Sequence, residues 1–97
     1  MHGLLIEHTT MTGKRATVRD IWEKLMQPAI AANAGHLAYA YSFGQDDDMI
    51  TAFQVYASKT EAEAFLEHPS YLEYLEASRP FLTGAPKVTI LDVLWLK

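Results

Sequence analysis

Seven side chains in this sequence have the types and spacing to hold a small aromatic molecule and to move a proton. Side chains alternate between the faces of a strand, so Gln54 and Tyr56 should share one face of the strand-like run that ends at Tyr56. On two further predicted strands, the same alternation aims His8 and Tyr41 toward the helices. The full set expected around one cavity is His8, Trp22, Tyr41, Gln54, Tyr56, Phe65 and Tyr71. Aromatic walls with few polar groups suit a flat phenolic ligand.

His8 is the candidate base of this cavity, because an imidazole with an ordinary pKa of about 6.5 can accept a phenol proton near neutrality. An ionised hydroquinone gives an electron to O2 more readily than the neutral form does. Gln54 and Tyr56 would orient the ligand oxygens. The other histidines are expected to be structural, at a strand end, on the opposite sheet face and at a helix break: His2, His36 and His68. The alternative is a plain core whose tyrosine hydroxyls reach backbone groups.

Composition excludes several kinds of site. Cysteine is absent, which removes disulfides, thiolate nucleophiles and zinc-thiolate centres. No pair of histidines or carboxylates has metal-ligand spacing on a helix, and the run at 46–48 looks like an ordinary hairpin loop, so we expect no metal. The net charge of −4 argues against a nucleic-acid partner. The one basic cluster, Lys14, Arg15 and Arg19, is expected to be a solvated face.

The length of 97 residues predicts a single domain over residues 1–97. No segment approaches the roughly 20 apolar residues that a membrane span requires, so no membrane partner is expected. The start of the chain has no basic region before its aliphatic residues and meets Glu7 after three of them, which favours a first strand over a signal peptide. The expected location is therefore the cytoplasm.

The first half of the chain predicts three strands and one helix. A strand over 3–10 ends at the turn around Gly13, and a helix follows with an apolar stripe at Val18, Ile21, Trp22, Leu25 and Ala29. Pro28 should kink or tighten its last turn. Residues 33–35 should close the helix with positive φ. Strands at 36–43 and 49–56 flank a polar hairpin loop.

The second half predicts two helices and a last strand. Ser58 and Glu61 form a capping-box pattern that starts a helix, with Ala62, Phe65 and Leu66 facing inward, and His68–Pro69 should end it. A second such pattern predicts a helix start at Ser70, with Tyr71, Leu72 and Leu75 inward. Residues 79–80 mark its end, and residues 88–96 should form the final strand.

The element order βαββααβ predicts an α+β, ferredoxin-like split βαβ fold with a four-stranded antiparallel sheet. Helices would then cover one face only, and the other apolar face needs a partner. The apolar run at 93–96 has no remaining intramolecular partner. Together these features predict a homodimer.

In four segments the sequence resembles the antibiotic biosynthesis monooxygenase domain, a family of dimeric α+β barrels, and the resemblance covers almost the whole chain. The segments are residues 12–14, 35–39, 53–58 and 84–88. The resemblance implies a pocket between helices and sheet in each protomer. It also implies small aromatic or quinol-type substrates, oxidised by O2 without metal, flavin or haem. Some relatives degrade haem, and others have no established activity.

The departures from the family pattern bear on the reaction. Many relatives have Tyr-Glu-x-Trp at the end of the third strand, where residues 53–56 here are Phe-Gln-Val-Tyr. Relatives also often have histidines at the positions that Leu66 and Tyr71 take in this sequence. Haem-degrading relatives have an asparagine at His8 and a haem-ligating histidine near Leu75, so haem degradation is disfavoured. Two hypotheses remain: a cofactor-independent monooxygenase of a small aromatic or quinol-type substrate, and a non-catalytic dimeric module that binds an aromatic ligand or stabilises a partner.

Overall fold

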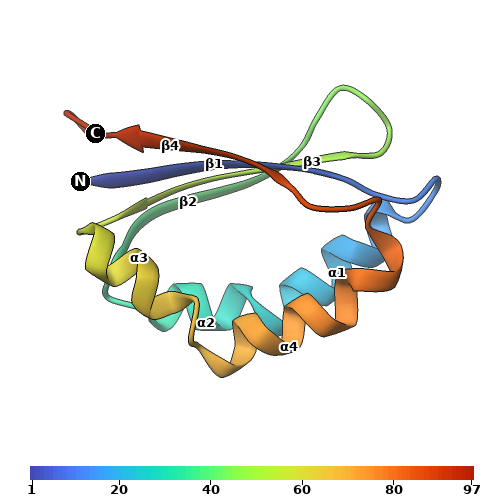
Figure 1. Ribbon diagram of the computed structural model, residues 1–97, viewed down its shortest axis with the longest axis horizontal. Coiled ribbons are helices and arrows are strands. Elements are labelled where there is room, and N and C mark those ends of the chain that lie inside the picture. Colours follow the sequence, from blue (N-terminus) through green and yellow to red (C-terminus); the bar gives the residue numbers. More distant parts are fainter.

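The computed structural model describes all 97 residues as one antiparallel sheet with helices on one face (Figure 1). The strands are β1 (His2–Thr9), β2 (His36–Phe43), β3 (Met49–Tyr56) and β4 (Lys87–Asp92). The helices are α1 (Arg15–Leu25), α2 (Gln27–Ala32), α3 (Lys59–Phe65) and α4 (Pro69–Ser78), followed by the 3-10 turn η1 (Arg79–Phe81). The sheet order β2-β3-β1-β4 confirms the predicted ferredoxin-like α+β fold.

Local sequence signals set most of these boundaries. The break between α1 and α2 falls at Met26, and Pro28 sits in the first turn of α2, where its missing N–H is not needed. At the start of α3 the Ser58 hydroxyl accepts a hydrogen bond from Glu61 N at 3.2 Å, as predicted. β2 and β3 have the predicted bounds.

Three expected boundaries were wrong. Asn33 closes α2 in an extended conformation and Gly35 has no positive φ, because the chain runs directly into β2. α4 begins at Pro69 rather than Ser70, since the His68 imidazole caps it by accepting from Ser70 N at 3.1 Å. β4 ends at Asp92, and residues 93–97 leave the sheet ladder.

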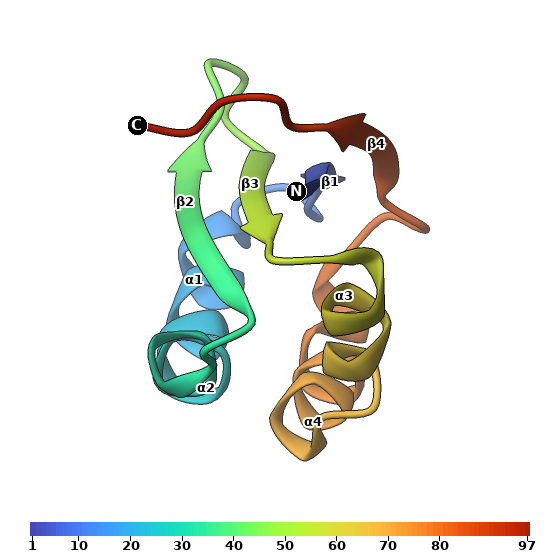
Figure 2. The same cartoon turned by 90° about the vertical axis from the view of Figure 1, so that its left-hand side faces the viewer.

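Residues 93–97 cross the sheet on the side away from the helices (Figure 2). Val93 N donates to Met1 O at 3.0 Å, and the Val93 side chain lies 2.6 Å from the position that a Cβ on Gly3 would take. Glycine is therefore needed at position 3 for this crossing. Leu94 and Trp95 remain 86% and 76% exposed.

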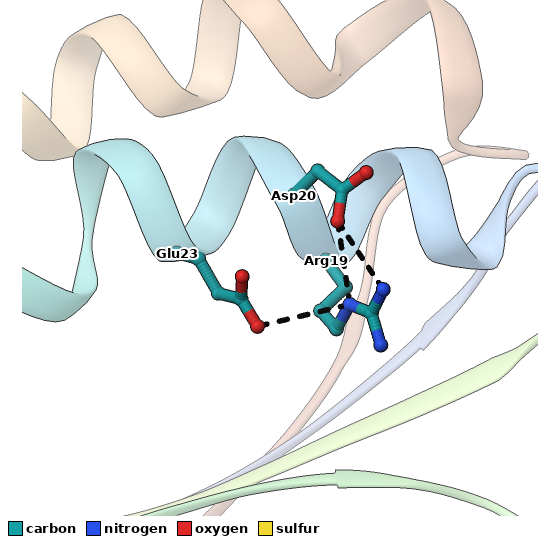
Figure 3. A network of polar contacts seen from close by, with 3 residues as sticks. All are labelled: Arg19, Asp20 and Glu23. Atoms are coloured by element: carbon teal, nitrogen blue, oxygen red, sulfur yellow. Dashed lines mark hydrogen bonds and ion pairs between the residues drawn. The ribbon is translucent and has the colours of Figure 1, made fainter.

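The basic cluster at the start of α1 is used within the chain. Arg15 donates to three carbonyls of the β2–β3 hairpin, at Gly44, Asp46 and Met49, over 2.9–3.3 Å. Arg19 pairs with the neighbouring carboxylates Asp20 and Glu23 on the exposed face of α1 (Figure 3). Exposed pairs of this kind add little stability. Arg15 therefore anchors the hairpin, while Arg19 lies on the predicted solvated face.

Candidate aromatic-binding cavity

A cavity of about 710 Å³ lies between the sheet and the helices. All seven side chains expected to share a site line it, namely His8, Trp22, Tyr41, Gln54, Tyr56, Phe65 and Tyr71. Strands β1, β2 and β3 supply one wall, and α1, α3 and α4 supply the other. The lining also includes polar and aromatic residues outside the predicted set, among them His2, Tyr39 and Tyr74, and His36 contacts the lining residue Gln54. Binding of a substrate by these residues stays a prediction.

One end of the cavity holds two buried polar atoms without a hydrogen-bond partner, His8 Nδ1 and the Tyr41 hydroxyl. Buried polar atoms are normally bonded, so two unpartnered ones in residues that line a cavity are unusual. Burial lowers the pKa of His8, which keeps the imidazole neutral at pH 7. Burial raises the pKa of Tyr41 and keeps its phenol protonated. This end therefore presents a neutral imidazole nitrogen and a neutral hydroxyl.

Trp22 holds the Tyr41 ring in place from α1. The two rings stack with centroids 4.0 Å apart and planes 19° apart. The Trp22 indole N–H donates to the Tyr39 hydroxyl at 3.3 Å. Burial raises the pKa of Tyr39 to about 12, and this hydrogen bond opposes the rise. The aromatic wall is thus fixed by stacking and by one hydrogen bond, and its tyrosines do not ionise near neutrality.

The other end is built around His36. Strict alternation along its strand predicted that this residue lies on the opposite sheet face. That placement was wrong. In the β2–β3 pairing His36 is opposite Tyr56 while Ala38 is opposite Val55, so Leu37 is an extra residue in a β-bulge. The bulge shifts the alternation and turns the imidazole to the helix-covered face. There, His36 Nε2 lies 3.0 Å from Gln54 Oε1.

Aromatic packing surrounds this second polar group. The His36 ring lies 4.2 Å from the Tyr56 ring and 4.7 Å, edge to face, from the Phe65 ring. Burial lowers the pKa of His36, opposed by its hydrogen bond with Gln54. Gln54 and Tyr56 are only 5% and 3% exposed. They form part of the core as well as the cavity wall.

The inward face of α4 differs from the predicted one. Tyr71, Tyr74 and Ser78 follow the i, i+3, i+7 spacing of one helix face, and Tyr74 and Ser78 are buried. Leu72, expected inside, is 47% exposed, whereas Leu66, which follows α3, lines the cavity although it is 50% exposed. The tyrosine stripe was present in the sequence, but the greater hydrophobicity of leucine favoured the wrong face.

The cavity opens to solvent along β4. Val88 and Ile90 line it from the sheet but are 50% and 69% exposed, because no helix covers this edge. Lys59 and Glu63 form an ion pair on α3 at the same rim, 3.8 Å apart and well exposed. A flat ligand could therefore enter between β4 and the helix pair α3 and α4.

Other kinds of site find little support in the residues. No group of three or more histidine or acidic side chains is arranged to hold a metal ion. Leu75, near the position where haem-degrading relatives have their iron ligand, contributes only carbon atoms to the cavity wall. None of the helices is both long and apolar enough to cross a lipid bilayer.

Neither protein-family models nor curated proteins match this sequence. Solved structures do match the fold. A Nitrosomonas europaea protein provisionally named an antibiotic biosynthesis monooxygenase superposes with a TM-score of 0.89 at 16% identity, over 98% of this chain and 100% of that one. Rv0793 from Mycobacterium tuberculosis gives 0.85 at 21% identity, over 98% and 96%. A further antibiotic biosynthesis monooxygenase gives 0.86 at 10% identity, over 97% and 99%.

The chain therefore has the fold found in antibiotic biosynthesis monooxygenases, as its sequence predicted. At these identities the likeness concerns the fold alone. The reaction has to be argued from the cavity.

Proposed function

We propose that this protein is a cofactor-independent monooxygenase that oxidises a small, flat hydroxylated aromatic with O2 in the cavity. The single observation that carries the proposal is the largely aromatic cavity whose lining includes His8 and Tyr41, each with one buried polar atom that has no partner within the chain. A buried polar atom without a partner costs about 1–3 kcal/mol. A ligand hydroxyl that reached either atom after a small rotation of its side chain would recover part of that free energy.

His8 would act as the base that ionises the substrate. Its lowered pKa keeps the imidazole neutral at pH 7, so one of its two ring nitrogens is free to accept a proton. The neighbouring tyrosines cannot take this role, because burial raises their pKa values. A phenolate transfers an electron to O2 more easily than a phenol does. The apolar cavity would exclude water from the ionised ring.

The proposed reaction balances without an added reductant. In a hydroquinone, one atom of O2 enters the ring as a hydroxyl and the other leaves as water, and the ring becomes the corresponding hydroxyquinone. The substrate supplies all the electrons, so neither flavin nor haem is required. The proton that His8 accepts from the phenol leaves with the water.

The experiment is O2 uptake with 1,4-dihydroxynaphthalene at pH 7, corrected for uncatalysed autoxidation. We expect faster uptake with the protein and a hydroxyquinone product that carries one atom of ¹⁸O from ¹⁸O2. Binding without any added uptake would contradict the enzyme proposal and favour the non-catalytic aromatic-binding module. A spectrum of the purified protein at visible wavelengths checks for bound flavin or haem.

We also propose that the protein works as a homodimer joined through the helix-free face of the sheet. Leu91 is 37% exposed on this face, and the crossing segment adds Leu94 and Trp95, which are far more exposed. Large contiguous apolar patches on a monomer are uncommon and mark interaction sites. A second copy of the chain offers the same apolar patch in return.

Sedimentation at micromolar concentration tests the homodimer. We expect a dimer for the parent and a shift toward monomer for Trp95→Lys, because a charge would be buried in the interface. Leu72→Lys is the matched control, since Leu72 is an exposed leucine on the helix side. A stable, cooperatively melting monomer of the parent chain would overturn the dimer.

A further inference from the structure

A chain of hydrogen bonds leads from a backbone amide to the wall of the cavity. Gly35 N lies 3.3 Å from Asn33 Oδ1, and a backbone N–H can only donate. Asn33 Oδ1 is therefore the acceptor, which fixes the orientation of the side-chain amide. Asn33 Nδ2, the donor end of that amide, lies 2.8 Å from His36 Nδ1. His36 Nδ1 must accept this hydrogen bond and so carries no proton.

The state of Nδ1 determines what Gln54 offers to the cavity. A neutral imidazole with a bare Nδ1 carries its proton on Nε2. His36 Nε2–H then donates to Gln54 Oε1 across their 3.0 Å separation. With Oε1 engaged, the free part of this amide is its NH2 group. Along Gly35, Asn33, His36 and Gln54 each group therefore donates to the next, and the last of them lines the cavity.

We propose that this relay makes Gln54 a fixed hydrogen-bond donor that selects ligands with an acceptor oxygen, a carbonyl or a phenolate, at its end of the cavity. Without the relay an amide can turn over and accept instead, so an isolated glutamine discriminates poorly. His36 is therefore a positioning residue, acting on the ligand through Gln54. The proposal rests on the proposed function only in that the cavity must hold an aromatic ligand.

The packing around His36 makes the relay rigid. Its ring is held between the Tyr56 and Phe65 rings, at 4.2 and 4.7 Å between centroids. The β-bulge at Leu37 directs the imidazole inward, and Gln54 is nearly fully buried. Turning the Gln54 amide over would place an NH2 group against a donating Nε2–H. That would lose the hydrogen bond and leave both groups without an acceptor.

The first test measures the His36 tautomer without any ligand. Nitrogen NMR on protein with ¹⁵N-labelled histidine, assigned with His36→Gln, distinguishes a protonated Nε2 from a protonated Nδ1. We expect the Nε2–H form at pH 8. A Nδ1–H form would overturn the relay, whatever the protein binds or catalyses.

The second test compares two flat tricyclic probes of similar size. The polar group of 9-fluorenone is a carbonyl that only accepts, and that of carbazole is an N–H that only donates. We expect fluorenone to bind about three- to tenfold more tightly, the range expected for one hydrogen bond. Equal affinities would overturn the proposal. Failure of both probes to bind alongside an Nε2–H tautomer would reject the ligand-binding role of the cavity and leave the relay standing.

Asn33→Asp tests the direction of the relay from outside the cavity. A carboxylate accepts and cannot donate, so at pH 9 it should draw the His36 proton to Nδ1. His36 Nε2 would then accept from Gln54, whose oxygen would turn to the cavity. The preference should shift from fluorenone toward carbazole, with the tautomer changed in the same NMR spectrum. An altered tautomer with an unaltered preference would overturn the selection by Gln54. Thermal melting checks that the variant is folded.

Discussion

The two ends of the cavity differ in whether their polar groups have hydrogen-bond partners within the chain. At one end His8 Nδ1 and the Tyr41 hydroxyl are buried without partners. At the other end every polar group of His36 and the oxygen of Gln54 are engaged in one directed relay. Unsatisfied groups favour the arrival of a ligand, while satisfied groups give a fixed geometry. The comparison suggests a reactive end and an orienting end.

The largest expected effect is the loss of turnover in His8→Gln. Removing a general base commonly lowers the rate about 10²–10⁴-fold. The deficit at pH 7 should shrink at high pH, where the substrate ionises unaided. O2 uptake across pH measures this, with binding of 9-fluorenone and thermal melting as checks on the fold.

His68→Asn is the matched histidine control and should keep the parent rate, because His68 does not line the cavity and asparagine can still cap α4. Equal turnover by His8→Gln and the parent at neutral pH would remove His8 from the mechanism.

At the orienting end, Gln54→Leu should lower the free energy of unfolding by about 1–3 kcal/mol. The reason is that His36 Nε2–H loses its acceptor in a partly buried setting, where Gln54 itself is buried. Urea denaturation of the ligand-free protein measures the change. An unchanged stability would mean that water replaces the amide and that this end is less rigid than the hydrogen bonds indicate.

Tyr41→Phe, unlike Gln54→Leu, should not lower the free energy of unfolding. It removes a hydroxyl that has no partner, so the ligand-free protein should be as stable as the parent or slightly more stable. The affinity for a hydroxylated aromatic such as 1-naphthol should fall about three- to tenfold, which corresponds to one hydrogen bond. A clear loss of stability would show that the hydroxyl has a partner in solution and that the two ends are alike.

The smallest effect concerns pH and tests both ends together. Burial lowers the pKa of His8 and of His36 below the ordinary value of 6.5. Below that pH the unfolded chain binds more protons than the folded chain, so the free energy of unfolding should fall as pH falls from about 7. His8→Gln and His36→Gln should each flatten this dependence in urea denaturation. A parallel slope in either variant would show that its imidazole is freely solvated.

Much of the fold followed from local signals in the sequence. Apolar periodicity gave β2 and β3 their bounds, and Ser58 marked a helix start because capping acts within one turn. Pro28 was expected only to kink or tighten the last turn of one helix, whereas a separate helix, α2, starts beside it at Gln27. The seven residues expected around a cavity do line one cavity, because strand alternation fixes which side chains share a face. Their role in binding remains a prediction.

Other features needed the tertiary structure. The bulge at Leu37 exists only in the pairing of β2 with β3, so strict alternation within one strand placed His36 on the wrong face. On α4 the tyrosine stripe faces inward, where Tyr74 joins the buried cluster formed by side chains of the sheet, α1 and α3, and Tyr71 packs against it. Leu72, the more hydrophobic candidate, is left outside.

The sequence by itself therefore determined the order of elements, the sheet and the residue types available to the cavity, since these depend on interactions between near neighbours in the chain. Only the tertiary structure decided which hydrogen bonds are made and which are left open. The relay joins Asn33 and His36 to Gln54, far along the sequence, and the unpartnered His8 and Tyr41 come from different strands. Contacts between distant segments depend on the exact course of both backbones, which no local pattern specifies.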